Sequence, residues 1–358
     1  MPDQAARIAV ICLESTAPGT APGYHLTGTL RRLEVVGVRD PMVVADDSGR
    51  SRARRLARLL RRSWGAAHHH DVVVMRWHLL AAVALLPWRV AGRRIVLLVP
   101  GVPSDVFSSH GWLRPFGRLL TTSSVASWRW ADAIVASHAG IARQIAQVAP
   151  GLRATVGVAP NGPPPVVAAL PDVHRERRYV VFAGSLARWQ GLPLMLEALA
   201  HPEWPEEVDL VVIGDGAETQ RLQTATDQRL VWMGRLDPSR TQAHLRGALA
   251  SLSVKTFGPA TEHGISPFKV AEAHALGVPV VATDLPGQGD YLRAQGGGLI
   301  IGQDPAELAR AVRTLLDPGI REPLVEQARA AGARNGWERD AGVLAEAVGM
   351  PQRRASAR

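Results

Sequence analysis

Short apolar runs that alternate with helix-like segments constrain the fold of this chain more than any other feature of its sequence. Short apolar runs bounded by turn residues are typical of buried strands, whereas helices carry apolar residues three and four apart. In the first half, strands are predicted at 7–13, 42–45, 71–75, 94–99, 133–136 and 155–159. Helical patterns fill most of the gaps between them. The alternation predicts an α/β fold with a mostly parallel sheet.

The alternation starts again after a proline-rich segment. The sequence NGPPPVVAALPDVHRER predicts a domain linker near residues 162–178. Beyond it, strands are predicted at 179–183, 208–213, 230–233, 250–254, 279–282 and 298–301. The chain has 358 residues, 46% of them hydrophobic, which is more than one core usually needs. We therefore expect two domains of similar plan that share a cleft.

Positive charge is concentrated in the first half of the chain. Up to Val167 there are 20 arginines against 9 acidic residues, a net charge of +11, whereas the remainder has a net charge of −2. This asymmetry predicts that the first half meets an anionic partner: a membrane surface, a phosphorylated acceptor or nucleic acid. Nucleic acid is disfavoured, because the arginines are not interleaved with the aromatic or glycine patterns of known modules.

One segment of the first half, residues 52–64, is both basic and amphipathic. Leu56, Leu59 and Leu60 lie at helical spacing among arginines. Two interpretations remain open: a solvated helix that packs on the sheet, or a helix that contacts the anionic inner face of a membrane. The longest apolar stretch, Leu79 to Trp88, is too short to span a bilayer and is predicted to be core.

The remaining composition argues against a secreted or metal-dependent protein. Cys12 is the only cysteine, so no disulfide framework is expected. The first residues lack the pattern of a secretory signal, which predicts a cytoplasmic protein. The run His68 to His70 has no accompanying carboxylates, and its consecutive side chains point in different directions. We therefore expect no metal site.

Three glycine-containing motifs of the second half follow predicted strands. They are Phe182-Ala-Gly-Ser-Leu186, Val211-Val-Ile-Gly-Asp-Gly216 and the segment from His263 to Val281. Glycines between a strand and a helix let backbone amides approach a phosphate, which the helix dipole also favours. In the second motif, Asp215 could instead cap a helix. In the third, Ser266 and Pro267 suit the start of a helix that Gly277 ends.

Lys269 and Glu272 lie three residues apart on that last helix and therefore share a face. One interpretation is a solvated ion pair. The other is that Lys269 neutralises a diphosphate while Glu272 accepts hydrogen bonds from ribose hydroxyls.

The ordered motifs FAGSLARWQGLPLMLEAL, VVIGDG, VWMGRL, GISPFKVAEAHALGVPVVAT and GGGLII resemble glycosyltransferase family 4, the retaining group 1 enzymes. The first half is similar in PGYHLTGTLRRL, ADAIVASHAGIA and APNG. The resemblance implies a GT-B fold, in which two doubly wound Rossmann-like domains face each other across a cleft. It implies an acceptor domain at 1–167, a nucleotide-sugar donor domain at 168–336, and a segment at 337–358 that partly crosses back and ends in a disordered basic tail.

The sequence departs from the family pattern at several positions. Gly264 stands where the first of two glutamates is expected, and Glu262 is its candidate replacement. Ser185 and Gln190 stand where an arginine and a lysine usually grip the diphosphate, so Arg188 and Lys269 become the candidates. The usual histidine after the strand ending near Leu98 is also missing. His25, His110 and His138 are the remaining candidates for acceptor binding.

The resemblance implies transfer of a glycosyl group from a nucleoside diphosphate sugar, a UDP-sugar or a GDP-sugar, to a hydroxyl of a cell-envelope or natural-product acceptor. Retention without a dedicated nucleophile implies a front-face mechanism. Catalytic roles fall to Lys269, Arg188 and Glu262, with no metal or further cofactor. Donor contacts are expected from Gly23, Gly184, Ser185, Gln190, Gly214, Gly216, Arg235, Gly264, Ile265, Ser266 and Glu272. The amides of Gly184, Ser185, Ile265 and Ser266 are expected to face the diphosphate, and Gly23 to close over it from the other domain.

Two alternatives to this function remain open. The departures from the family pattern are also those of a degenerate protein that acts as a non-catalytic partner. A GT-B epimerase or phosphorylase would instead turn over sugar nucleotides without an acceptor or depend on phosphate.

Overall fold

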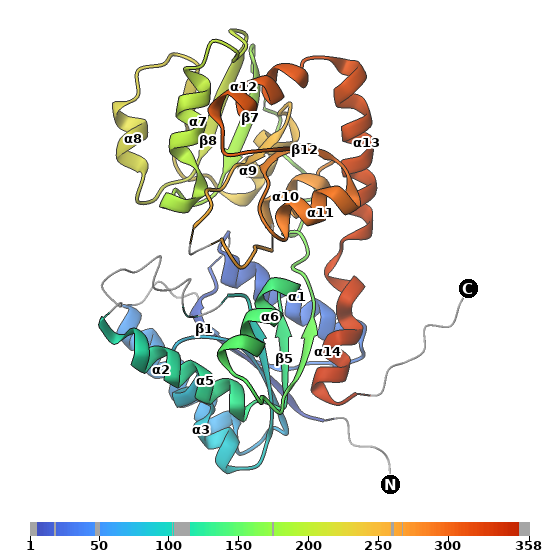
Figure 1. Ribbon diagram of the computed structural model, residues 1–358. Coiled ribbons are helices and arrows are strands. Elements are labelled where there is room, and N and C mark those ends of the chain that lie inside the picture. Colours follow the sequence, from blue (N-terminus) through green and yellow to red (C-terminus); the bar gives the residue numbers. More distant parts are fainter. Residues whose placement is uncertain are drawn as a thin grey trace, which may run out of the picture. The chain divides into compact units, whose positions relative to one another are not determined.

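The computed structural model describes residues 6–17, 19–46, 51–101, 103, 115–173, 175–258, 261–266 and 268–350. The chain divides into two compact units (Figure 1), which are Met1–Asn161 with Trp337–Arg358, and Gly162–Gly336. Each unit contains a six-stranded sheet in which every described pairing is parallel. The predicted α/β class is confirmed, and each predicted strand is present within two residues of its expected ends.

The sheet of the first unit has the strand order β2-β1-β3-β4-β5-β6. Its strands are β1 (Ile8–Ser15), β2 (Met42–Asp46), β3 (Val72–Arg76), β4 (Arg94–Val99), β5 (Ala133–Ala136) and β6 (Thr155–Val158). Alternate residues of β1 face opposite sides of the sheet, so that Ile11 enters one core and Val10 the other. Short β-branched runs such as VVVM in β3 are buried on both faces, as a parallel sheet covered by helices requires.

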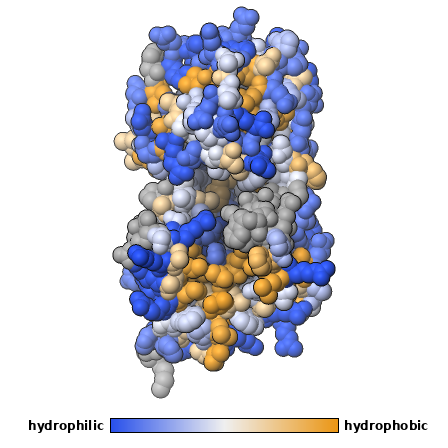
Figure 2. All heavy atoms as spheres, turned by 90° about the vertical axis from the view of Figure 1, so that its left-hand side faces the viewer, coloured by the Kyte–Doolittle hydropathy of each residue, from blue (hydrophilic) through white to orange (hydrophobic). Residues whose placement is uncertain are grey.

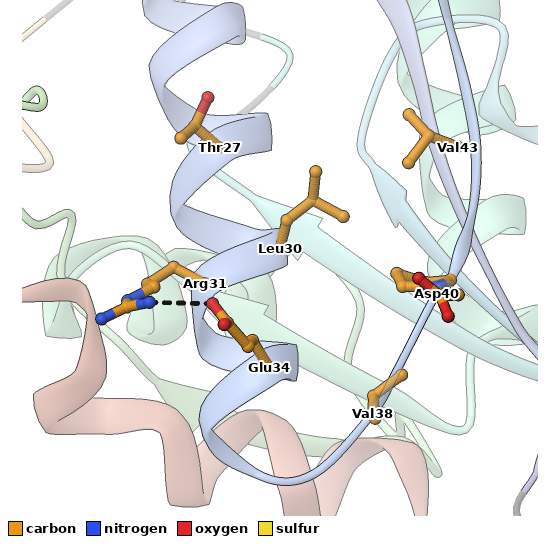
Figure 3. Close-up of a pocket in the computed structure, with 8 residues that line it drawn as sticks. Thr27, Leu30, Arg31, Glu34, Val38, Asp40 and Val43 are labelled. Carbon is orange, nitrogen blue, oxygen red and sulfur yellow. Dashed lines mark hydrogen bonds and ion pairs between the residues drawn. The ribbon is translucent and has the colours of Figure 1, made fainter.

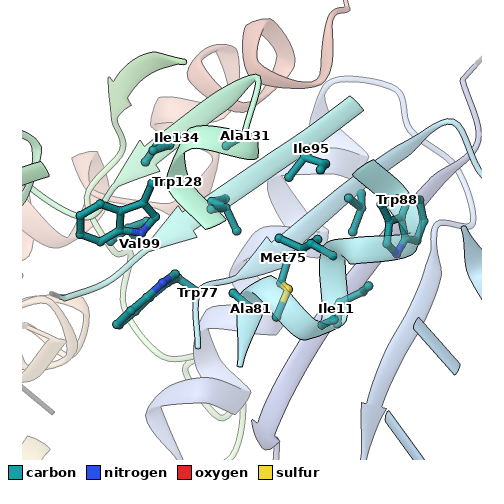
Figure 4. Packing of buried hydrophobic residues seen from close by; sticks show 14 of the residues in the cluster. Ile11, Met75, Trp77, Ala81, Trp88, Ile95, Val99, Trp128, Ala131 and Ile134 are labelled. Atoms are coloured by element: carbon teal, nitrogen blue, oxygen red, sulfur yellow. The ribbon is translucent and has the colours of Figure 1, made fainter. Parts of the chain in front are cut away.

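Helices cover both faces of this sheet. They are α1 (Ala21–Val35), α2 (Arg52–Ala66), α3 (Ala81–Val90), α5 (Gly117–Trp130), α6 (Ala139–Val148) and α14 (Ala341–Val348). One face packs against α2, α3, α5 and α6 around the large side chains Met75, Trp88 and Trp128 (Figure 4). The other face packs against α1 and α14. None of the helices in the described ranges is long and apolar enough to cross a membrane.

The C-terminal segment packs on α1 of the first unit. Trp337, in the short 3-10 helix η3 (Trp337–Asp340), lies directly over Gly28, where a methyl group would overlap the indole ring. The Nε of Arg32 donates to the Trp337 carbonyl at 3.0 Å, and its guanidinium lies 4.8 Å from the ring centroid. Arg31 pairs with Glu338 at 2.7 Å. The absence of a side chain at Gly28 thus admits a tryptophan more than 300 residues away in the sequence.

The sheet of the second unit has the order β12-β11-β10-β7-β8-β9. Its strands are β7 (Arg178–Ala183), β8 (Val208–Ile213), β9 (Leu230–Trp232), β10 (Ser251–Ser253), β11 (Val280–Thr283) and β12 (Gly298–Ile301). Its helices are η2 (Arg188–Gln190), α7 (Leu192–Leu199), α8 (Thr219–Thr224), α9 (Pro238–Arg246), α10 (Phe268–Ala275), α11 (Gln288–Gln295), α12 (Pro305–Thr314) and α13 (Pro318–Arg334). The strand order reverses between β7 and β10, and ligands bind parallel α/β sheets at such a point.

Candidate functional site

The loops that follow β7 and β8 are joined to each other by backbone hydrogen bonds. The Gly184 amide donates to Ile213 O at 2.9 Å, and the Leu186 amide donates to Asp215 O at 2.8 Å. Gly214 has φ +130°, and a methyl group there would overlap the Gly184 carbonyl. The glycines therefore bring two backbones into contact. The Gly184 amide was expected to face a diphosphate, and this expectation is wrong because the amide already donates within the fold.

Lys269 reaches the end of β7 from helix α10. Its Nζ lies 4.7 Å from the centroid of the Phe182 ring, and a methyl group on Gly184 would overlap this Nζ. Burial lowers the pKa of Lys269 to about 8, although the nearby Glu272 raises it. The side chain keeps part of its surface accessible. The structure thus places a partly desolvated ammonium group beside the glycine loop. Because Gly184 has no side chain, there is space for this group.

Glu272 lies one turn further along α10 and is held by Gln242 of α9. Gln242 Nε2 donates to Glu272 Oε1 at 3.4 Å and to Pro165 O at 2.9 Å, and its Oε1 accepts from the Val167 amide at 2.9 Å. Burial raises the pKa of Glu272, opposed by the Gln242 hydrogen bond and the charge of Lys269. Sequence reasoning missed Gln242, since its partners lie in the linker segment and on α10, far away in the chain.

The loop between β10 and α10 explains why glycine stands at position 264. Thr261 Oγ1 donates to Thr256 O at 2.8 Å, and the Gly264 amide donates to Thr261 O at 3.0 Å. This turn leaves Gly264 at φ +95°, where a glutamate would be strained. Glu262 is exposed and pairs with His263 at 3.1 Å. The conformation of this loop therefore suits glycine at position 264 better than glutamate.

Two further predicted contacts of this loop have different outcomes. The Ile265 amide donates to Pro286 O at 3.1 Å, so the prediction that it faces the diphosphate is wrong. Ser266 precedes α10 and makes a further interaction within the fold. Pro267 lies outside the described residues.

The two arginine candidates, Arg188 on η2 and Arg235 after β9, lie near acidic side chains of the same unit. Arg188 has an 89% exposed side chain whose nearest acidic group is Glu218 at 3.9 Å. Arg235 donates to Asp215 at 2.8 Å. Asp215 does not cap α8, which begins only at Thr219, so the capping interpretation is wrong.

Ser185 and Gln190, which stand where the family usually has an arginine and a lysine, differ in their burial. Ser185 is exposed, whereas Gln190 is buried. Among the described residues, no hydrogen-bond partner is present for Gln190 Oε1. Gly216 has φ +154°, and a Cβ there would lie 2.8 Å from the Leu186 amide nitrogen. Gly216 therefore serves the packing of the two loops.

Lys255, the other lysine of the sequence, lies just beyond β10 and is buried. Its Nζ donates to Ser253 Oγ and to Gln288 Oε1, both at 2.8 Å. Burial and the charge of Lys269 lower the pKa of Lys255 well below its usual value. Gln288 Nε2 in turn donates to the carbonyls of Ser253 and Thr283. No sequence motif indicated this buried network, because its members come from three separate elements.

The candidates in the first unit have structural roles within that unit. The Gly23 amide donates to Thr20 Oγ1 at 3.2 Å, and a Cβ on Gly23 would lie 2.9 Å from the Thr16 and Ala17 carbonyls. His138 caps α6, since the Ile141 amide donates to its Nδ1 at 3.4 Å. Its role in acceptor binding stays a prediction.

His25 is buried on α1, with its ring edge-on to Trp337 at a centroid distance of 6.0 Å. Burial, followed by the charges of Arg76 and Arg32, lowers the pKa of His25 well below its usual value. His110 lies outside the described residues.

Comparison with known proteins adds the family. Residues 177–318 match the family model described as "Glycosyl transferases group 1". These residues, which make up most of the second unit, are similar to a group 1 glycosyltransferase domain. The D-inositol 3-phosphate glycosyltransferase of Acidothermus cellulolyticus is 29% identical over 234 residues, which are 58% of this chain and 51% of the relative. The chain thus spans about half the length of the curated relatives that it matches.

Solved glycosyltransferases share the fold of the whole chain. Anabaena HepE in complex with UDP and glucose has a TM-score of 0.68 at 17% identity, covering 96% of this chain and 99% of HepE. The sucrose-phosphate synthase of Thermosynechococcus elongatus has a TM-score of 0.69 at 14% identity, covering 96% and 98%. These likenesses show that the glycosyltransferase domain belongs to a two-domain α/β chain of GT-B type, as predicted.

A surface pocket of about 440 Å³ lies apart from the predicted site residues, on the first unit between α1 and the start of β2 (Figure 3). It is lined by Thr27, Leu30, Arg31, Glu34, Val38, Asp40, Pro41 and Val43. Arg31 and Glu34 form an ion pair at 2.8 Å along its wall. Within the described ranges, no cluster of three histidine, cysteine, aspartate or glutamate residues could hold a metal ion.

Proposed function

We propose that this chain transfers a sugar, with retention, from a nucleoside diphosphate sugar to a hydroxyl of a cell-envelope or natural-product acceptor. The observation that carries the proposal is the Lys269 ammonium beside Gly184, with Glu272 one turn away, in a group 1 glycosyltransferase domain. A UDP-sugar is favoured over a GDP-sugar, since HepE of the same fold is described with UDP and glucose.

The chemistry asks mainly for stabilisation of negative charge on the departing diphosphate. Lys269 supplies a positive charge in a partly desolvated position, where it acts more strongly than in water. Glu272, oriented by Gln242, offers carboxylate oxygens to the ribose hydroxyls. The helix dipole of α10 and the exposed loop at Ser185 add to the anion site. Gln190 offers a buried amide oxygen that lacks a partner in the described chain.

The charge of the first unit supports the proposals for the acceptor and for the location of the enzyme. Its positive charge suits an acceptor that carries an anionic group, and a curated relative is named for transfer to D-inositol 3-phosphate. The proposed enzyme is cytoplasmic, with peripheral contact to an anionic membrane near residues 52–64.

The donor is tested with the purified full chain by thermal shift against UDP-, GDP- and dTDP-sugars, because a ligand that binds the native state raises its apparent stability. Glu272→Ala should abolish the shift that the preferred donor causes. Glu326→Ala, on the exposed face of α13, is the matched control and should keep it. If no sugar nucleotide raises the unfolding temperature of the wild-type chain, and none is turned over by it, the proposal is wrong.

The alternatives give different results in the same experiment. A non-catalytic partner would show neither transfer nor hydrolysis with any donor that it binds. An epimerase or phosphorylase would convert the donor without an acceptor, or only with inorganic phosphate. Stereochemistry at the anomeric carbon of the product decides whether transfer proceeds with retention.

A further inference from the structure

Three neighbouring helices of the first unit contain no acidic residues. Helices α2, α3 and α5 lie side by side on one face of the sheet, with α3 in contact with both others. Together they contain nine arginines and no aspartate or glutamate: Arg52, Arg54, Arg55, Arg58, Arg61, Arg62, Arg89, Arg118 and Arg129. Much of the positive excess of the chain therefore lies on these three helices, where Arg58 is paired with Asp46 of β2 at 3.3 Å.

Helix α3 is apolar on both of its faces. Its inner face buries Leu85 and Trp88 in the core. On the outer face, Val83, Leu86 and Val90 are 43%, 50% and 80% exposed and lie three and four residues apart, so they form one stripe. A helix that is apolar all round is normally buried on both sides, and this one is not. The prediction that residues 79–88 are core is thus correct for one face only.

Exposed apolar side chains also lie on α2 and α5, the two helices that contact α3. Trp64 of α2 is 43% exposed, and its Nε1 donates to the Val83 carbonyl at 3.1 Å, which holds the indole against α3. Leu119 of α5 is 68% exposed. Figure 2 shows an apolar area on this unit, bordered by hydrophilic side chains. We call the surface of Trp64, Val83, Leu86, Val90 and Leu119 the apolar stripe.

Helix α2 itself does not supply an apolar surface for lipid. Leu59 is fully buried, and Leu56 and Leu60 pack against the same core. The first interpretation of residues 52–64, a helix packed on the sheet, is therefore correct for the leucines. Arg61 of this helix is exposed and lies close in sequence to Trp64, whereas Arg62 donates to the Val43 carbonyl of β2 at 3.0 Å.

We propose that the apolar stripe docks on an anionic lipid bilayer, with α3 at the boundary of headgroups and acyl chains and the arginines on the phosphates. An aromatic and aliphatic stripe edged by arginines has the composition of an interfacial membrane site. A second copy of the chain is disfavoured, because a symmetric dimer would oppose two arginine-rich faces that have no acidic residue. The docking specifies the surface of the membrane contact proposed above, and it does not depend on the sugar transfer.

The test is co-sedimentation of the full-length chain with vesicles of phosphatidylcholine alone or mixed with phosphatidylglycerol. Wild type should bind the anionic vesicles and not the neutral ones. The double variant Leu86→Asp with Val90→Asp should weaken binding by about tenfold or more, since it removes buried apolar area. Ile320→Asp, a 41% exposed position on α13, is the matched control and should bind like wild type.

A second variant separates charge from apolar contact. Arg61→Gln, Arg89→Gln and Arg118→Gln together should weaken binding and reduce its salt dependence, whereas Arg246→Gln on α9 should not. Unchanged thermal unfolding would show that each variant is folded. Three results would overturn the proposal: wild type that ignores anionic vesicles, an aspartate variant that binds them fully, or a concentration-dependent dimer that this variant abolishes.

Discussion

At the scale of a single residue, the proposed role of Lys269 predicts that donor binding depends on pH. Its pKa of about 8 means that the free protein carries the ammonium below this pH and loses it above. A bound diphosphate favours the cationic form, so binding above pH 8 must include uptake of a proton. The dissociation constant of an intact sugar nucleotide should therefore rise by about tenfold per pH unit there, and calorimetric titration would measure it. Lys269→Met should bind weakly at every pH; if it keeps the wild-type slope, another group is responsible.

Gly184 and Gly214 are neighbours that should respond differently to the same substitution. A methyl group on Gly184 meets the flexible end of Lys269, whereas one on Gly214 meets the backbone carbonyl of Gly184. Gly214→Ala should lower the free energy of unfolding by about 2 kcal/mol or more, measured with urea. Gly184→Ala should cost less stability but weaken donor binding. Equal losses in both quantities for both variants would contradict this distinction.

At the scale of elements, the sequence predicted the strands well and the contacts between loops poorly. Continuous apolar runs such as VVVM and VVFA are typical of strands that a parallel sheet buries on both faces, so these strands could be predicted from the sequence. The amides of Gly184 and Ile265 were assigned to a ligand, because nothing local shows that Ile213 and Pro286 accept their hydrogen bonds. Lys269 could be predicted from a local motif; Gln242 and Lys255 could not, because their partners come from distant segments.

The contact between α1 and η3 should show strong energetic coupling. Trp337 fills the space over Gly28, and both lie in the first unit. Trp337→Ala should destabilise the protein by about 3 kcal/mol or more. Gly28→Ala should also destabilise it, since its methyl group would overlap the indole ring. In the double variant the overlap disappears, so the combined loss should be smaller than the sum. Strict additivity in urea unfolding would argue against this packing.

At the scale of the whole molecule, the two units differ in net charge, which matches the two functions proposed for them. The first unit holds 24 arginines and 12 acidic residues, a net charge of +12, whereas the second unit has a net charge of −3. Membrane docking would rely on exposed arginines, which salt screens strongly; donor binding would rely on a partly buried lysine, which salt screens less.

Raising the salt from about 0.05 M to about 0.5 M should therefore weaken binding to anionic vesicles severely, while donor affinity changes by about threefold or less. Vesicle sedimentation and donor titration on one preparation would measure both. The arginine-to-glutamine triple variant serves as the control, because its vesicle binding should respond less to salt while its donor affinity matches wild type. If both affinities fell in parallel with salt, the two kinds of binding would share one electrostatic surface, and the assignment of donor to the second unit and membrane to the first would be wrong.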